Sequence, residues 1–276
     1  MFLLNGKIRD CLNVTDRGLQ YGDGLFETFR VHHGRPLFWQ RHFQRLQMGC
    51  EVLKIPLPDV HTLKNEALSL CQSVDSAVLK LIITRGSGGR GYRPPEVPEP
   101  SRLFSLHPFP DYPAQFYTDG ITVRVCQSRL GINPLLAGYK HLNRLEQVLA
   151  RSEWSDPSIQ EGLLLDINDH LIEGTMSNVF LIQKGRIITP LLDQCGIKGV
   201  IRQWIFDTGR QIGTEVNEQH IDLADLKLAD EVFVCNSVIG IWPVSRIADH
   251  QWPVGPVTLQ LQHLLKQSEL ESGDVD

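Results

Sequence analysis

The segment from Gly162 to Pro190 most constrains the fold, because it consists of short apolar runs separated by turn residues. It reads GLLLDINDHLIEGTMSNVFLIQKGRIITP, with Asn168-Asp169 and Lys184-Gly185 at two of the breaks. Runs this short, bounded by Asn, Asp and Gly, are typical of strands and too short for helices. The segment therefore predicts a meander of three or four strands, and a chain rich in sheet on this side.

The elements around this segment follow from the same periodicities. We predict strands at 121–128, 215–219 and 231–235, and helices at 142–154, 198–211 and 256–268. Leu142, Leu145 and Leu149 supply the apolar stripe of the first of these helices. The terminal segment ESGDVD is expected to be frayed.

The first 110 residues combine strands and helices, which is an α+β pattern. Asn5-Gly6 is a hairpin turn dipeptide, and we predict helices at 38–54 and 59–72 and strands at 77–84 and 102–107. PFPDYPAQFYTDG, at 108–120, has three prolines and little periodicity. The expected organisation is a smaller domain over 1–110, a connector over 111–120 and a larger domain over 121–276.

Composition limits the class of protein. The six cysteines form no CxxC pair and no cluster with metal-ligand spacing, so we expect reduced thiols, a cytoplasmic protein and no metal. A net charge of −5 gives no electrostatic reason to bind nucleic acid. No stretch approaches the roughly 20 apolar residues of a membrane helix, and three apolar residues near the start are too few for a signal peptide.

Two charged residues stand in unusual places. Lys140 lies in AGYKHLNRLEQ, just before a predicted helix, where a cation interacts unfavourably with the helix dipole. Glu173 lies in LIEGTMSN between two apolar runs, in a hairpin or bulge that could aim its side chain. Taken alone, an exposed lysine and a solvated turn glutamate explain these two residues better than a catalytic role does.

Three further segments have the composition of anion-binding turns. ITRGSGGRGY, at 83–92, lacks the Gly-Lys-Ser/Thr of a Walker A loop, and the prolines that follow exclude a helix, so a mobile loop and a ligand-binding loop both remain open. GIKGVIRQW, at 196–204, is a glycine-punctuated turn that opens a helix. CNSVIGIWPV, at 235–244, ends a strand in small hydrogen-bonding residues.

Taken together and in order, these motifs resemble the fold-type IV pyridoxal-phosphate enzymes. The resemblance spans residues 21 to 244 and rests on YGDGLFETFR, HFQRL, GYKHLNRLEQ, EGTMSNVF, GIKGVIRQW and CNSVIGIWPV. It implies an α+β, two-domain structure like that of the D-amino-acid aminotransferases. A smaller N-terminal α/β domain and a larger, β-rich C-terminal α/β domain would hold pyridoxal 5'-phosphate between them. The resemblance also implies a homodimer.

The resemblance assigns roles to the cofactor-binding positions. Lys140 would carry the cofactor as a Schiff base and move the proton, and Glu173 would pair with the protonated pyridine nitrogen. The cofactor phosphate would be bound by Arg45 of HFQRL, the backbone amides of Val200 and Ile201, and Asn236 and Ser237.

Substrate-binding positions follow from the same resemblance. Thr28 would assist catalysis, and Arg85, Arg90 and Tyr92 would face substrate carboxylates. Arg144 differs from the tyrosine or hydrophobic residue found near this place in related enzymes, and it receives no role.

Three functions remain open. RGSGGRGY and YKHLNRLEQVLAR most resemble the aminodeoxychorismate lyases, which implies conversion of 4-amino-4-deoxychorismate into 4-aminobenzoate and pyruvate for folate biosynthesis. The alternative is a branched-chain or D-amino-acid aminotransferase of the same fold. A third hypothesis is a phosphate-binding module that uses RGSGGRGY without catalysis.

Overall fold

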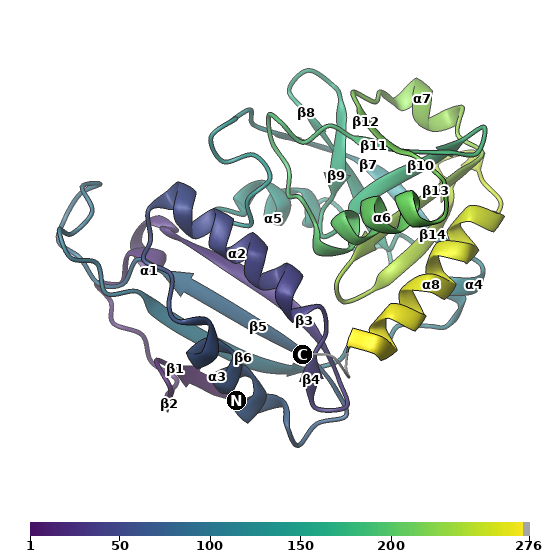
Figure 1. Ribbon diagram of the computed structural model, residues 1–276. Helices are drawn as coiled ribbons and strands as arrows, with labels where there is room; N and C mark the ends of the chain where they lie inside the picture. Colours follow the sequence, from purple (N-terminus) through teal and green to yellow (C-terminus); the bar gives the residue numbers. More distant parts are fainter. Residues whose placement is uncertain (273–276) are drawn as a thin grey trace. The chain divides into compact units, whose positions relative to one another are not determined.

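The computed structural model describes residues 1–272 and divides into two compact units (Figure 1). The first unit contains Met1–Pro110, Tyr139–Asn143 and, of the described residues at the end of the chain, 269–272, and the second contains Asp111–Gly138 and Arg144–Ser268. Lys140 therefore belongs to the first unit, in a five-residue segment, Tyr139–Asn143, that interrupts the second unit along the chain. Residues 111–120, for which we predict a connector, belong to the second unit.

The first unit is built on a six-stranded antiparallel sheet of order β2-β1-β6-β5-β3-β4. Its elements are β1 (Phe2–Leu4), β2 (Lys7–Ile8), α1 (Arg17–Tyr21), β3 (Gly24–His32), β4 (Arg35–Pro36), α2 (Trp39–Leu53), α3 (Val60–Cys71), β5 (Ser76–Thr84) and β6 (Ser101–Pro108). The two helices and the two strands predicted here are confirmed. So is the first hairpin, in which Asn5 and Gly6 both have positive φ, 49° and 76°, as a tight two-residue turn requires.

Helices α2 and α3 cover one face of this sheet (Figure 1). Alternate residues of β5 are buried beneath them, together with Leu46 of α2 and Leu63 of α3, which are 2% and 0% exposed. Asp59 caps α3 by accepting a hydrogen bond from the Thr62 amide at 2.8 Å. The opposite face, which we call the open face, carries half-buried polar residues such as Thr28 and Lys80.

Strand β3 is absent from the sequence prediction, and one residue explains why. Its residues 25, 27, 29 and 31 all point into the core, but residue 27 is a glutamate. A buried charge in the apolar series removes the alternation by which a half-buried strand is found.

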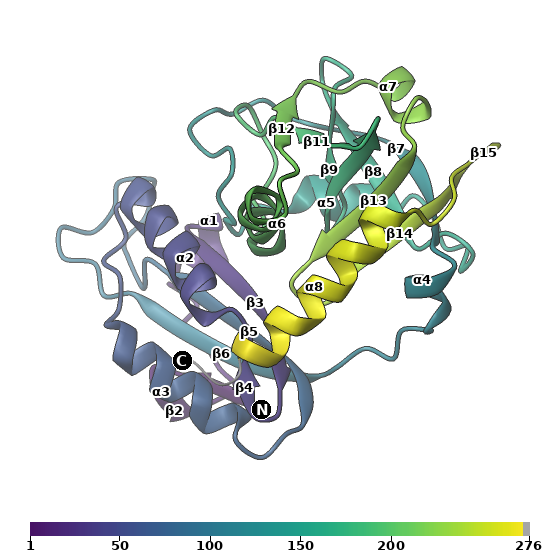
Figure 2. The same cartoon turned by 45° about the vertical axis from the view of Figure 1, so that its right-hand side comes forward.

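The second unit contains a nine-stranded sheet of order β12-β11-β10-β13-β14-β7-β8-β9, with β15 paired to β14. Its elements are α4 (Gln115–Thr118), β7 (Ile121–Leu130), α5 (Leu145–Arg151), β8 (Glu161–Asp166), β9 (Leu171–Gly174), β10 (Asn178–Gln183), β11 (Arg186–Pro190), α6 (Val200–Gln211), β12 (Val216–Gln219), α7 (Leu223–Lys227), β13 (Glu231–Asn236), β14 (Gly240–Ile247), β15 (His250–Gln251) and α8 (Pro256–Ser272). Helix α8 runs beside β13 and β14 (Figure 2), where Gln262 Nε2 donates to the Ile241 carbonyl at 3.0 Å.

Both faces of this sheet are buried. In β8, Leu163 and Leu165 enter one apolar cluster, and Leu164 between them enters another. Helices on the sheet cover the side chains that alternation would otherwise leave in water, which is why three leucines follow one another in the middle of β8.

The predicted meander is wrong in its pairing. The four strands form two hairpins, β8–β9 and β10–β11, and β7, β14 and β13 lie between these hairpins in the sheet. The sheet curls so that β9 comes back into contact with β10 without pairing to it. The edge of β10 that a meander would pair with β9 pairs with β13 instead, and β13 lies outside residues 162–190.

One further prediction needs correction, and one strand was missed. The helix expected at 142–154 spans only Leu145–Arg151. It begins late because the Leu142 amide donates to the carbonyl of Gly24, at the start of β3, and the Asn143 side chain donates to the carbonyl of Gly22, just before β3. Strand β14 is absent from the sequence prediction, and it contains a proline, Pro243, which is unusual in a central strand. Pairing of β14 with β7 begins only at Val244, so the missing N–H of Pro243 leaves no gap in that ladder.

The remaining predicted helices and strands of this unit are confirmed in α6, α8, β7, β12 and β13. The expected fraying of ESGDVD concerns residues 271–276; α8 reaches Ser272, and residues 273–276 lie outside the described part of the chain. None of the described helices is long and apolar enough to cross a membrane. Within residues 1–272 there is no group of three or more His, Cys, Asp or Glu side chains that could hold a metal ion.

Candidate active site

Lys140 lies on a short extended segment that pairs with β3. Its carbonyl accepts a hydrogen bond from the Phe26 amide at 2.9 Å, and His141 forms an antiparallel bridge with Leu25. The ammonium Nζ lies 4.2 Å from the centroid of the Phe26 ring. Thr28, two residues after Phe26, points to the same open face of the sheet. The backbone therefore fixes Lys140 at the face that carries Thr28.

Glu173 is a buried carboxylate in β9 of the second unit, 4% exposed. Its Oε2 accepts the Ile197 amide at 2.8 Å, and its Oε1 accepts from Gln147 Nε2 at 3.3 Å. Burial lowers the pKa of the neighbouring Arg144 guanidinium, and the negative charge of Glu173 opposes that change. A carboxylate held in this way can stabilise a cationic ring nitrogen.

The turn after Glu173 is organised by a second buried carboxylate, Glu161, which is 1% exposed. Glu161 accepts hydrogen bonds from the amide of Thr175 at 3.0 Å and from the hydroxyl of Ser177 at 2.7 Å. It also accepts the Met176 amide at 3.3 Å. These bonds explain why the uncharged, donor-rich TMS follows Glu173, and they fix where β10 begins.

Val200 and Ile201 are the first residues of α6, and their amides have no acceptor within the helix itself. The preceding Gly199 amide donates to Asn178 Oδ1 at 3.0 Å. A Cβ at residue 199 would lie 2.1 Å from that oxygen, so this contact requires glycine. The start of α6 is thus held beside β10, and its amides suit an anion.

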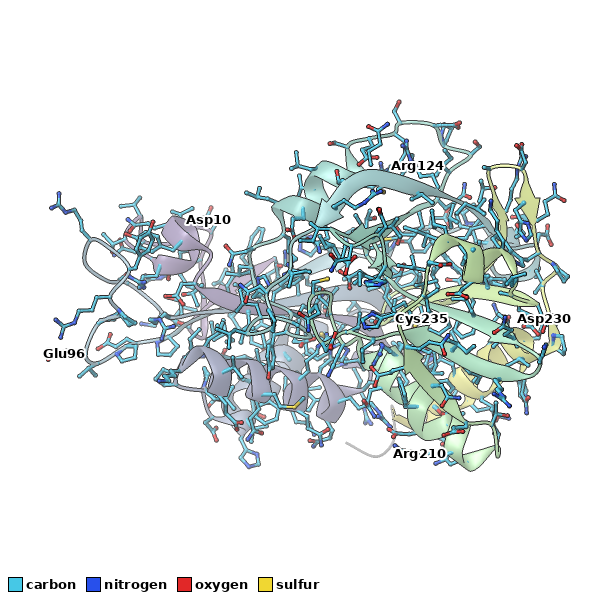
Figure 3. The ribbon with its side chains drawn as sticks, turned by 90° about the horizontal axis from the view of Figure 1, so that it is seen from above. Asp10, Glu96, Arg124, Arg210, Asp230 and Cys235 are labelled. Carbon is cyan, nitrogen blue, oxygen red and sulfur yellow. The ribbon has the colours of Figure 1, made fainter. Side chains whose placement is uncertain are left out.

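Asn236 ends β13, and Ser237 follows it. The Asn236 side chain donates to the Met176 carbonyl at 2.9 Å and accepts the Val238 and Ile239 amides at 2.8 and 2.9 Å. Asn236 therefore shapes the turn that presents Ser237. Cys235, directly before it and labelled in Figure 3, is 1% exposed, and burial raises its pKa.

Arg45 lies on α2 and is 9% exposed. Its Nε donates to Glu27 Oε1 at 2.8 Å, and His42 Nδ1 lies 2.6 Å from the other oxygen of that carboxylate. Neither Glu27 nor His42 was predicted from the sequence to have a role at the site. Two features of the sequence could have indicated them. Glu27 interrupts a series of alternate apolar residues, and His42 lies one helical turn before Arg45.

The three residues predicted to bind substrate carboxylates lie in the loop after β5, but Arg85 is buried and the other two are exposed. Arg85 is 6% exposed and makes two bonds to Asp23, at 2.8 and 2.9 Å, and one each to the Leu53 and Lys54 carbonyls. This guanidinium anchors the loop, and a substrate carboxylate would have to displace protein acceptors from it. Its role in substrate binding stays a prediction.

Arg90 and Tyr92 lie farther along the same loop, which continues to Glu96, labelled at its projecting end in Figure 3. Tyr92 is 86% exposed. The buried Arg17 holds the loop by donating to the Gly91 and Tyr92 carbonyls at 2.9 and 3.2 Å. The loop is therefore tethered at its backbone, while the Arg90 and Tyr92 side chains stay accessible.

Comparison with known proteins gives the class. Residues 24–247 match the family model described as amino-transferase class IV, so the chain belongs to this family. It is 38% identical over 266 residues to an aminodeoxychorismate lyase of Vibrio harveyi, covering 95% of this chain and 98% of the relative. The branched-chain-amino-acid aminotransferase of Escherichia coli is 30% identical over 267 residues, covering 91% and 85% of the two chains.

A solved structure gives the same picture of the fold. The crystal structure of 4-amino-4-deoxychorismate lyase from Pseudomonas aeruginosa superposes with a TM-score of 0.93 at 46% identity, covering 97% of this chain and 98% of that one. The resemblance to fold-type IV enzymes and the α+β class are thereby confirmed. Membership in this family favours the two enzyme hypotheses over a phosphate-binding module without catalysis.

Proposed function

We propose that this chain is a pyridoxal-phosphate-dependent lyase that converts 4-amino-4-deoxychorismate into 4-aminobenzoate and pyruvate, a step of folate biosynthesis. The observation that carries the reaction class is Glu173, a buried carboxylate fixed by the Ile197 amide and Gln147. Similarity to lyases along nearly the whole chain supports the choice of substrate.

The donor set fits pyridoxal phosphate. Glu173 would hold the protonated ring nitrogen, and the amides of Val200 and Ile201 would bind the phosphate, with Ser237 and the Asn236 turn beside them. Arg45 would add a guanidinium to the phosphate site, and Lys140 would link to the aldehyde carbon. When bound, the pyridoxal group withdraws electrons from the substrate carbon that bears the amino nitrogen.

The substrate's amine would take the place of Lys140 at the aldehyde carbon, and the lysine amine freed in this way does the proton chemistry. Its Nζ removes the proton from that carbon as a general base. The electron pair left behind forms a ring double bond and expels the enolpyruvyl ether oxygen from the adjacent carbon. The leaving group takes up a proton as pyruvate, and the ring becomes aromatic. Thr28, on the same face as the Phe26 ring beneath Lys140, would bind substrate close to that amine.

The substrate has two carboxylates, one on the ring and one on the leaving group. Arg90 and Tyr92 are accessible on a tethered loop and can meet such a group. Arg85 would contribute mainly by holding the loop against Asp23.

Product release without an amino acceptor separates the lyase from the alternative, a branched-chain or D-amino-acid aminotransferase. We expect purified protein with pyridoxal phosphate to form pyruvate and 4-aminobenzoate from 4-amino-4-deoxychorismate in equal amounts, with no keto acid added. The measurement is product chromatography over time, with substrate alone as control. A strict requirement for a keto acid would refute the lyase and leave the aminotransferase.

We also propose that the protein is a homodimer. Leu145, Val148 and Leu149 of α5 are 76%, 61% and 62% exposed, and their spacing places them on one helix face. An apolar stripe of this kind marks a surface that another protein covers.

Light scattering should give twice the chain mass, and Leu149→Glu should lower the measured mass towards that of the monomer. Leu228→Glu, at a leucine 67% exposed elsewhere, is the matched control and should leave the mass unchanged. A monomeric wild type would refute the proposal.

The cysteines support a cytoplasmic location. All six are unpaired, and five of them are buried. Thiols in this state are typical of proteins that fold in a reducing compartment.

A further inference from the structure

A charged cluster lies inside the apolar core of the first unit. It consists of Glu27 of β3 and His42 and Arg45 of α2, which are 1%, 0% and 9% exposed, and we call it the Glu27 cluster. Arg45 donates hydrogen bonds to the Glu27 carboxylate from both Nε and Nη2, and His42 Nδ1 lies 2.6 Å from Glu27 Oε2. One carboxylate thus fixes two side chains that lie one helical turn apart.

Core packing alone does not explain this cluster. The His42 ring lies 4.2 Å from the Phe29 ring, and residues 25, 29 and 31 around Glu27 are apolar and buried. Removing charges from water is costly, and a buried ion pair is often no more stabilising than apolar residues of the same size. Furthermore, His42 Nε2 is buried with no hydrogen-bond partner in the described part of the chain. These observations favour a positioning function.

The charge states follow from the surroundings. Burial alone would raise the pKa of Glu27, but the Arg45 guanidinium and then His42 outweigh it and hold that pKa at about 2. Burial lowers the pKa of His42, and the positive charges of Arg45 and Lys140 lower it further, while Glu27 opposes them. At neutral pH the cluster is therefore an ionised Glu27–Arg45 pair with a neutral His42 whose Nδ1–H donates to Glu27. The influence of Lys140 on His42 also places the cluster within electrostatic reach of the catalytic lysine.

We propose that Glu27 and His42 are positioning residues that fix the Arg45 guanidinium for the phosphate of the cofactor. The inference rests on the proposed function and extends it to two residues with no other assigned role. Glu27 binds the Nε–Nη2 edge and so sets the plane of the Nη1 edge. An arginine side chain samples many rotamers, and a guanidinium already held in one plane loses less freedom when it binds an anion.

The test compares pyridoxal phosphate with pyridoxal, which has the aldehyde and ring but no phosphate. Each is titrated into cofactor-free full-length protein and followed by visible absorbance. We expect Glu27→Gln to weaken pyridoxal phosphate binding by about tenfold or more, the cost of losing a charge-assisted contact, and to change pyridoxal binding less than about twofold. Arg45→Met should show the same phosphate selectivity. Glu66→Gln, which breaks another ion pair of this unit, with Arg102, is the matched control and should change neither.

A pair of variants at residue 42 guards against simple misfolding. His42→Asn places an amide N–H near the position of Nδ1 and should keep the affinity for pyridoxal phosphate close to that of the wild type. His42→Leu has no such donor and should bind pyridoxal phosphate more weakly, with pyridoxal binding little changed. Equal weakening of both ligands in Glu27→Gln, or no rescue by asparagine, would overturn the inference. If the wild type forms product normally and the variants give either of these results, the positioning role alone is refuted. A wild type that neither links pyridoxal phosphate nor forms product refutes the proposed function.

Discussion

Lys140→Ala is expected to lose the visible absorbance of lysine-linked pyridoxal and to lower turnover by at least about 10²–10⁴-fold, the usual contribution of a general base. The loss should come from the amine, because the backbone of this segment is held independently of the side chain. The Lys140 carbonyl bonds to the Phe26 amide, and the Leu142 amide bonds to the Gly24 carbonyl at 3.0 Å. Without cofactor, the variant should therefore unfold at the same temperature as the cofactor-free wild type.

Lys80→Ala is the matched control, because Lys80 Nζ lies 5.2 Å from the centroid of the same Phe26 ring. This variant should keep the absorbance and the linked cofactor. Borohydride reduction followed by peptide mass spectrometry should find the cofactor on residue 140 in the wild type and in Lys80→Ala. An unchanged absorbance in Lys140→Ala, or the cofactor on another lysine, would contradict the assignment.

Local pattern was sufficient to predict much of the fold. The helices α2, α3 and α6 have clean periodicity, and each buries its apolar face as that periodicity predicts. The strands β5 and β7 were predicted from short apolar runs rich in β-branched residues. Strand pairing was not predictable in the same way. Whether β10 pairs with β9 or with β13 depends on residues far along the chain, and the periodicity of a strand contains no information about its partner.

The candidate site shows the same division. The positions of Lys140 and Glu173 came from motifs in sequence, whereas Glu27 was overlooked because its charge hides the strand that carries it. The partners of Arg85 were also out of reach, since Asp23 and the carbonyl groups of α2 meet it only after folding. A polar residue that violates a local pattern is thus a functional signal that pattern reading discards.

Glu173→Gln is expected to retain the cofactor but to lower turnover by about 10²-fold or more, because the ring nitrogen loses the charge that keeps it protonated. The fold should tolerate the change. A glutamine oxygen can still accept the Ile197 amide, and the new amide group can donate to Gln147 Oε1, which has no hydrogen-bond partner within the described residues. Only the charge is then removed, and steady-state kinetics of pyruvate release measure its effect.

Glu231→Gln separates this loss of charge from general damage to the second unit. Glu231 is as buried as Glu173, at 4% exposure, and it caps α8 by accepting the Val257 and Thr258 amides at 3.1 and 2.8 Å. We expect it to lower the free energy of unfolding by about 0.5–2 kcal/mol, as for other helix caps, with turnover unchanged. If Glu173→Gln instead turned over normally, or if both variants lost turnover and stability together, Glu173 would be a structural carboxylate and the ring nitrogen would need another partner.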